Sequence, residues 1–244
     1  DRGFSSLEDA RAFLEPRWSG LHDPSEIPDL DEAVDMILAV RDAAGTVAVF
    51  GDYDVDGISG SAILMEVFSH LGIQVISRLP HRVNEGYGLS TTAVEEFARQ
   101  EVDLIVTVDG GSNDGEAIGL AQELGLEVIV TDHHPIRNPA EGILLVHPDR
   151  PDRECLSVDL CGAGVAYKLA WAVAREAGGG GPVDEATRDL LVEMSSFAAL
   201  GTVADVVPLT GENRILVRHR RKILRSTRRP GLEALTDLCA IDRT

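Results

Sequence analysis

Three aspartates occupy alternating positions directly after an apolar run. The stretch reads FGDYDVDG over residues 50–57, and its acids are Asp52, Asp54 and Asp56. Carboxylates this close repel one another, and leaving them unpaired at the end of a strand is unfavourable. Divalent cations between the carboxylates would remove the repulsion, and carboxylate oxygens are the ligands that such hard cations prefer. The stretch therefore indicates a metal site.

Two further candidate strands are followed by acids or histidines. DLIVTV and EVIVT lead into Asp109 and into the run Asp132, His133 and His134, respectively. In an open parallel sheet, the carboxyl ends of the strands form the edge that binds ligands. Any one of these acids is more simply explained as a helix N-cap, but three strands that deliver them to the same edge favour a shared site. Carboxylates and imidazoles without thiolates indicate Mn²⁺ or Mg²⁺ rather than a structural zinc.

These residues could hold two metal ions. Asp54 and Asp56 are two residues apart, so in extended backbone their side chains would point the same way and each could bind one ion. An acid shared between two ions about 4 Å apart would complete a two-metal site for phosphoryl transfer. Asp205 lies in the apolar stretch ALGTVADVV and is a fifth candidate ligand, because a buried carboxylate needs a partner. Its alternative role is that of a helix C-terminal acid bonded to backbone amides.

Runs of β-branched residues alternate with helical stretches, a pattern typical of βαβ units around a parallel sheet. The predicted strands are residues 46–50, 74–79, 103–108, 127–131 and 143–146. The predicted helices are residues 60–71, 90–100, 115–124, 162–177 and 184–200, the last with Asp184 as its N-cap. We therefore predict an α/β fold: a doubly wound, mainly parallel five-stranded sheet with helices on both faces, followed by a helical C-terminal linker.

The 244 residues, 44% of them apolar, suffice for one sizeable core. We expect peripheral helices over residues 1–44, a metal-binding catalytic domain over 45–209, and a basic helical linker over 210–244 that leads to a second domain missing from this chain. The chain starts at Asp1 rather than Met, which indicates a segment of a longer protein. Three cysteines without a CxxC pair, and no apolar run near 18 residues, predict a cytoplasmic protein without disulfides or membrane spans.

The charge of the chain is strongly negative but unevenly distributed. A formal net charge of −19 argues against a nucleic-acid partner, because phosphate binding usually needs a basic surface. Residues 214–229 nevertheless carry eight of the 22 lysines and arginines and no acid. Two interpretations of this basic segment remain open: a solvated helix face or linker, and one wall of a path for nucleic acid.

Four motifs, in this order along the chain, resemble the DHH phosphoesterase superfamily, in particular its RecJ branch of single-strand-specific exonucleases. They are GDYDVDG (51–57), TVDGG (107–111), TDHH (131–134) and SSFAALGTVADVVPLTGENR (195–214), and the resemblance covers residues 45–240. It implies a 5′–3′ exonuclease on single-stranded DNA that acts in DNA repair or recombination by two-metal in-line hydrolysis with Mn²⁺ or Mg²⁺. It also implies single-strand-binding protein or a helicase as partners.

The resemblance further implies roles for individual residues. Asp54 would bind one ion and Asp56 the other, with Asp109 bridging them. His133 and Asp205 would also bind the second ion, and Asp132 would support the histidines. His134 would contact substrate phosphate, and Asp52 would either support the first ion or cap the turn. The remaining phosphate contacts would be Arg82 and Asn84 of HRVNEGYGL (81–89) and the backbone amides of Gly162 and Gly164 in CGAGVAYKL (161–169), for which tight helix packing is the alternative.

Three positions depart from the family pattern. Phe50 stands where related enzymes have a histidine that binds the first ion, so we expect that ion to be held weakly. Gly110 and Gly115 stand where the RecJ pattern has a cysteine and a histidine, and activity would fall if that histidine contributes to the site. Two alternative functions stay open: a DHH phosphodiesterase of short oligonucleotides or cyclic dinucleotides, and a catalytically inactive RecJ-like scaffold that binds replication proteins.

Overall fold

Five parallel strands form the central sheet of the computed structural model, which describes residues 6–137, 139–226 and 229–240, without the side chains of residues 9 and 221–226. The strands are β1 (Thr46–Gly51), β2 (Gln74–Arg78), β3 (Leu104–Val108), β4 (Glu127–Thr131) and β5 (Leu144–Val146). Their order is β2-β1-β3-β4-β5, and every neighbouring pair is parallel. The predicted five-stranded sheet is therefore confirmed, and each strand ends within one residue of its predicted bounds.

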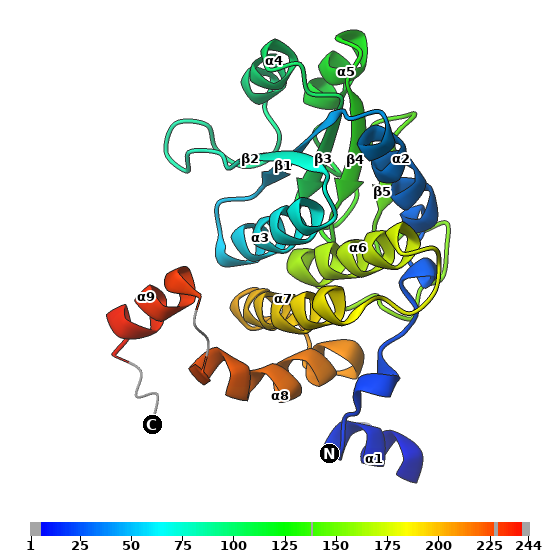
Figure 1. The fold of residues 1–244 in the computed structure, drawn as a ribbon, viewed down its shortest axis with the longest axis vertical. Coiled ribbons are helices and arrows are strands. Elements are labelled where there is room, and N and C mark those ends of the chain that lie inside the picture. The colour runs from blue at the N-terminus through cyan, green and yellow to red at the C-terminus, as the bar shows by residue number, and fades with distance from the viewer. Residues whose placement is uncertain (1–5, 138, 227–228, 241–244) are drawn as a thin grey trace.

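Helices cover both faces of the sheet (Figure 1). One face carries α2 (Leu30–Asp42), α3 (Val55–His70) and α6 (Gly162–Ala177), and the other carries α4 (Thr91–Arg99) and α5 (Gly115–Glu123). The alternation of side chains along β1 illustrates this division, since Val47 and Val49 pack with the first group of helices and Ala48 and Phe50 with the second. The doubly wound α/β architecture is therefore confirmed.

The later helices form further layers on the α3 side of the sheet (Figure 1). Helix α7 (Glu185–Ala204) packs on α3 and α6, and α8 (Gly211–Ser226) packs on α7. Asp184 caps α7 as predicted, since its Oδ1 accepts the amide of Thr187 at 3.0 Å. The expected helical C-terminal segment consists of α8 and the shorter α9 (Pro230–Leu238). Within the ranges that the structure describes, no helix combines the length and apolarity needed to cross a membrane.

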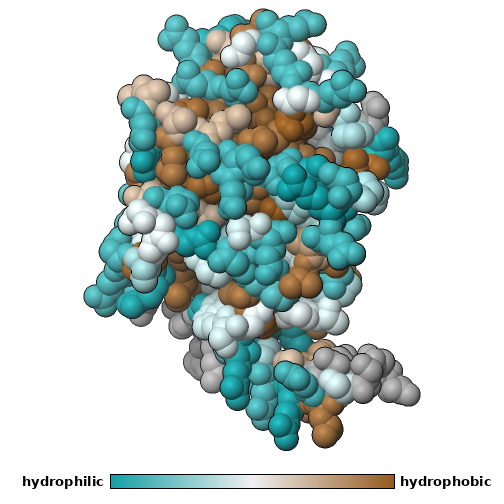
Figure 2. All heavy atoms as spheres, turned by 90° about the vertical axis from the view of Figure 1, so that its right-hand side faces the viewer, coloured by the Kyte–Doolittle hydropathy of each residue, from teal (hydrophilic) through white to brown (hydrophobic). Residues whose placement is uncertain are grey.

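The N-terminal segment is less peripheral than predicted. Helix α1 (Leu7–Leu14) contacts α8, and two 3-10 turns, η1 (Trp18–Gly20) and η2 (Pro24–Glu26), lead to α2. The fully buried residues of α2 are Leu30, Ala33, Val34 and Ile37. The prediction is therefore wrong for α2, because this helix covers β5 and the flank of α6 and belongs to the main core. Figure 2 shows the α2 side of the molecule, with hydrophobic surface gathered in its upper half and hydrophilic side chains over most of the remainder.

The residues that flank α2 and β5 also close one edge of the sheet. The carboxylate of Asp29 accepts the amide of Leu145 on β5 at 3.1 Å and the guanidinium of Arg150 at 2.6 Å. Arg150 in turn donates to the carbonyl of Leu145 at 3.2 Å. Side chains thereby satisfy the backbone groups of Leu145 at an edge that would otherwise present unpaired donors and acceptors.

Three arginines of the basic segment 214–229 turn toward the protein. The guanidinium of Arg214 lies 3.5 Å from a phenylalanine ring of α1, and that of Arg220, a residue 4% exposed, lies 4.2 Å from the tryptophan ring of η1. Arg229 forms ion pairs with glutamates of α3 and α7. For these three residues the structure favours helix packing over a path for nucleic acid, and the side chains of residues 221–228 lie outside the described ones.

Candidate metal centre

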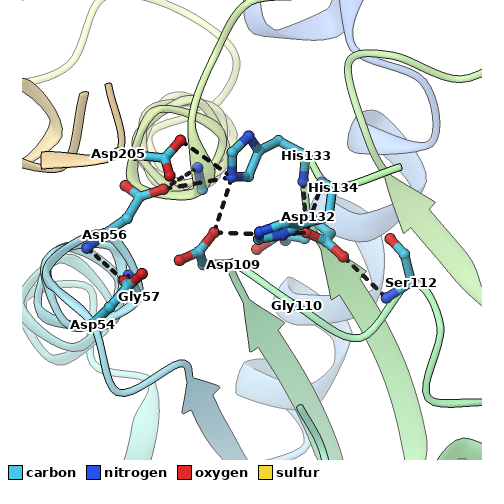
Figure 3. Close-up of polar contacts among 12 residues, drawn as sticks. Asp54, Asp56, Gly57, Asp109, Gly110, Ser112, Asp132, His133, His134 and Asp205 are labelled. Carbon is cyan, nitrogen blue, oxygen red and sulfur yellow. Dashed lines mark hydrogen bonds and ion pairs between the residues drawn. The ribbon is translucent and has the colours of Figure 1, made fainter. Parts of the chain in front are cut away.

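The candidate ligands meet at the carboxyl edge of the sheet (Figure 3). Asp54 and Asp56 follow β1, and Asp109 follows β3. His133 and His134 follow β4, and Asp205 lies at the end of α7. The rule that parallel strands present ligands at their carboxyl ends therefore places these side chains in contact. Residues as far apart in the chain as Asp54 and Asp205, 151 positions, share one small volume as a result.

The imidazole of His133 faces three carboxylates. Its Nε2 lies 3.1 Å from Asp109 Oδ1, 3.6 Å from Asp205 Oδ2 and 3.8 Å from Asp56 Oδ2. Among the residues that the structure describes, the Nε2 of His133 and the Oδ1 of Asp109 are buried and have no hydrogen-bond partner. Buried polar atoms without partners are rare and need an explanation. A divalent cation between these four side chains would supply one, so the residues fit a metal ion.

A second group of acids shares Asp109 with the first. Ligand atoms of Asp52, Asp54 and Asp109 lie within 4.8 Å of one another, and the same holds for Asp109, His133 and His134. Asp52 is 7% exposed, and its Oδ1 also lacks a hydrogen-bond partner in the described part of the chain. Asp109 thus adjoins both the Asp54 side and the His133 side of the centre, where a ligand shared by two ions would lie.

Asp54 is held by the first turn of α3. Its Oδ1 accepts the amides of Asp56 at 2.9 Å and Gly57 at 3.1 Å, which makes Asp54 the N-cap of a helix that begins at Val55. The helix therefore starts earlier than predicted. The prediction that Asp54 and Asp56 point the same way from extended backbone is wrong, because Asp56 already lies in the first helical turn. The cap of this turn is Asp54, so the alternative that Asp52 caps it is wrong.

Asp56 is held by the N-terminus of α6. Its Oδ2 accepts the amide of Gly162 at 2.7 Å, and its Oδ1 accepts the amide of Ala163 at 2.9 Å. The expectation that the Gly162 amide contacts a substrate phosphate is not met, because that amide already binds a protein carboxylate. Gly164 packs against the side chain of Leu160, in agreement with the packing alternative for this stretch.

Asp132 organises the two histidines. Its Oδ1 accepts the amides of His133 and His134 at 2.7 and 3.1 Å and the Nδ1 of His134 at 2.8 Å, while its Oδ2 accepts the amide of Ser112 at 3.1 Å. Burial alone would raise the pKa of Asp132, but the hydrogen bonds from His134 and Ser112 lower it to about 2. The hydrogen bond to Asp132 raises the pKa of His134 in turn. The hydroxyl of Tyr87 lies 3.1 Å from the same Nδ1.

Asp109 has unfavourable surroundings for a carboxylate without a cation. The residue is 1% exposed, and burial together with the charges of Asp56 and Asp54 raises its pKa to about 10. Its backbone lies in the left-handed region, with a φ of 62°, which Asp tolerates better than most residues. A divalent cation beside Asp109 would offset both the burial and the neighbouring charges. The electrostatics of this side chain therefore agree with the geometry of the site.

Of the two predicted phosphate contacts in the loop between β2 and α4, Arg82 lies beside the centre. The guanidinium of Arg82 is 5.2 Å from the ring of Tyr53. Burial raises the pKa of the nearby Asp52, and the charge of Arg82 is a minor opposing effect. Asn84 is exposed in the same loop. Phe50 is 2% exposed and packs in the core, so the position of the family's histidine contributes apolar surface and no ligand.

His147 supports the site and is not among the residues predicted from the sequence. It follows β5, is 1% exposed, donates from Nε2 to the carbonyl of His134 at 2.8 Å, and accepts the amide of Asp149 on Nδ1 at 3.1 Å. These two hydrogen bonds require the neutral tautomer with its hydrogen on Nε2, and burial accordingly lowers the pKa of His147. Its position directly after the predicted strand 143–146, at the same edge of the sheet, is the signal that could have identified it.

Comparison with known proteins identifies the family. The Single-stranded-DNA-specific exonuclease RecJ of Bacillus subtilis is 36% identical over 242 residues, which cover 99% of this chain and 29% of that protein. RecJ of Thermus thermophilus is 39% identical over 219 residues, which cover 89% of this chain and 30% of that protein. A crystal structure of exonuclease RecJ bound to manganese matches with a TM-score of 0.76 and 37% identity, covering 89% of this chain and 54% of that one. The chain thus spans less than a third of the length of these two relatives. Residues 46–202 match the model described as DHH family, N-terminal domain, and the chain belongs to the DHH family.

Proposed function

We propose that this chain is the catalytic, metal-binding part of a Mn²⁺- or Mg²⁺-dependent exonuclease that hydrolyses single-stranded DNA from its 5′ end. The observation that carries the proposal is the position of Asp109, which belongs to two groups of candidate ligands at once. A carboxylate shared in this way suits two-metal hydrolysis of a phosphodiester. The names of the similar proteins, single-stranded-DNA-specific exonucleases, support DNA as the substrate.

Each ion would have its own ligands in addition to the shared Asp109. Asp54, supported by Asp52, would hold the first ion, and the ligands of the second would be Asp56, His133 and Asp205. Oxygen donors dominate both sets, which suits Mn²⁺ and Mg²⁺. The Asp54 side has no histidine at the position of Phe50, so we expect it to bind its ion more weakly than the other side.

The side chains around the ions would orient the substrate. Two divalent ions at such a centre supply activation of the attacking water and neutralise charge that develops at the scissile phosphate. His134 is anchored to Asp132 through Nδ1, which leaves its Nε2 to donate to a phosphate oxygen. Arg82 and Asn84, both exposed in the neighbouring loop, would add a positive charge and an amide donor for the DNA backbone.

Digestion of 5′-end-labelled single-stranded DNA by the full-length protein, with Mn²⁺ and with EDTA, tests the proposal. We expect metal-dependent release of the labelled terminal nucleotide, and loss of that release in Asp109→Ala and in His133→Ala. Asp35→Ala, an exposed position on α2, is the matched control and should leave the rate at the parental value. Parental rates in both site variants would refute the assignment of the site.

Two assays of the full-length protein distinguish the proposed function from the two alternatives. Faster cleavage of a dinucleotide than of a long strand would indicate a phosphodiesterase of short oligonucleotides. A calorimetric titration in which Mn²⁺ does not bind would indicate a scaffold without this enzymatic activity.

A further inference from the structure

The N-termini of two different helices hold the two acids that follow β1. The amides of Asp56 and Gly57 in α3 bind Asp54, and the amides of Gly162 and Ala163 in α6 bind Asp56. Amides at a helix N-terminus lack partners within the helix, so they are free to bind the oxygens of a carboxylate. Each acid is thereby fixed in position by the protein itself.

Two glycines allow the ligands and helices to approach this closely. A Cβ atom at Gly201 in α7 would lie 2.3 Å from Asp56 Oδ1 and 2.7 Å from the Cβ of Ala163. A Cβ atom at Gly162 would lie 2.5 Å from the Cβ of Asp109 and 2.6 Å from its Oδ1. Cβ atoms in folded proteins essentially never approach other heavy atoms to less than 3.0 Å, so any side chain at either position would displace a ligand or a helix.

We propose that Gly201 and Gly162 are positioning residues of the metal centre. The bare Cα of Gly201 lets α7 lie against the Asp56 carboxylate while that carboxylate stays bonded to the amides of α6. The bare Cα of Gly162 leaves room for the side chain of Asp109 beside the N-terminus of α6. This inference rests on the proposed function, since it requires the centre to bind divalent ions.

The two glycines affect the two ions differently. Gly201 adjoins Asp56, which we assign to the second ion alone. Asp54, on the first ion, is held by amides of α3 rather than α6, and the contact that a Cβ atom at Gly201 would make is with Asp56 and not with Asp54. Gly162 adjoins Asp109, which bridges both ions. A methyl group at position 201 is therefore expected to weaken the binding of one ion, and a methyl group at position 162 the binding of both.

Titration of the full-length protein with Mn²⁺, followed by calorimetry and by the electron paramagnetic resonance signal of free Mn²⁺, tests this difference. Groups that orient a metal ligand typically contribute about 10–100-fold to metal affinity. We expect Gly201→Ala to lower the affinity for one ion by about that factor and to leave the affinity for the other near the parental value. Gly162→Ala should lower the affinity for both ions. Gly119→Ala in α5, whose added Cβ would meet no atom within 4 Å, is the matched control and should bind Mn²⁺ like the parent.

A double variant separates the effect on the metal from a general loss of packing. Adding Ala163→Gly to Gly201→Ala removes the clash between the two Cβ atoms and leaves the clash with the Asp56 carboxylate. We expect the melting temperature in EDTA to rise toward the parental value while the Mn²⁺ affinity stays low. Recovery of the affinity together with the stability would show that helix spacing alone is responsible, and would refute the role of Gly201.

The outcomes also separate this inference from the function on which it rests. Parental Mn²⁺ affinity in a folded Gly201→Ala protein, or equal weakening of both ions by that change, would overturn the inference and leave the proposed function intact. A parental protein that binds no Mn²⁺ would contradict the proposed function, and the inference with it.

Discussion

The metal-free protein should lose stability as the pH rises, and Asp109→Asn should remove a defined part of that loss. Burial and the charges of Asp56 and Asp54 raise the pKa of Asp109 from 3.8 to about 10. Between these two values the folded state keeps a proton on Asp109 that the unfolded state has released. The contribution of Asp109 to stability is therefore fully present below the lower value and decreases as the pH rises, by about 1.4 kcal/mol per pH unit for a single group.

Neighbouring groups do not cancel this slope above neutral pH. The pKa of His134 is raised by its hydrogen bond to Asp132, so its contribution is also lost as the pH rises above the ordinary value for histidine. The pKa of Asp132 is lowered to about 2, so that group titrates only in acid. Burial lowers the pKa of His147, which acts in the opposite direction, but mainly below the ordinary value for histidine and equally in both proteins, so a window between pH 7 and pH 8.5 leaves chiefly groups that act in the same direction.

Urea unfolding in EDTA at the two ends of this window measures the effect. The parent should lose about 2 kcal/mol more than Asp109→Asn, because Asn has nearly the same shape as Asp and does not titrate. Addition of Mn²⁺ at about 100 times its dissociation constant should stabilise the parent by about 2.7 kcal/mol and the variant by less. Equal pH slopes of the two proteins in EDTA would refute the view that folded Asp109 is protonated when no cation is bound.

Two further predictions concern stability at other positions. Lys168→Met should cost about 3–5 kcal/mol in urea unfolding, because Lys168 and Glu212 form an ion pair with both residues at most 4% exposed, and the change leaves the glutamate buried without its cation. Adding Glu212→Gln should recover part of that loss, whereas simple additivity of the two changes would contradict the buried pair. Val206→Gly should stabilise the protein by about 1 kcal/mol, because Val206 is 84% exposed and has a φ of 61°, a region that costs β-branched residues about 1–2 kcal/mol. A melting temperature at or below that of the parent would contradict the second expectation.

The sheet and the meeting of the acids could be predicted because both depend on local pattern. Apolar β-branched runs such as 104–108 are buried on both faces of a parallel sheet, so they read as strands without knowledge of their neighbours. Asp109 and His133 follow two such runs, and the geometry of parallel strands brings whatever follows them to one edge. The order of the strands and the elements that cover them depend on contacts distant in the chain.

The start of α3 and the environment of Asp56 could not be predicted, because both depend on contacts between residues far apart in the chain. Gly57 and Gly60 weaken the helical signal of the sequence after Asp54, but in the structure they permit close contact. A Cβ atom at Gly57 would lie 2.5 Å from the backbone nitrogen of Asp52, and one at Gly60 would lie 2.5 Å from the side chain of Val108. Such a requirement arises from tertiary packing and leaves no periodic trace in the sequence. The use of the α6 amides by Asp56, 106 positions away, is equally invisible.

The pair formed by Asp29 and Arg150 determines where an independently folding fragment can begin. The family match starts at residue 46, so a fragment cut to that boundary would lack both Asp29 and α2. It would expose the amide of Leu145 on β5 together with the apolar surface that α2 covers. An uncovered strand beside apolar surface is a template on which a second molecule can add a strand, and such fragments aggregate. We therefore expect the smallest soluble unit of this protein to begin before Asp29, outside the residues that the family model matches.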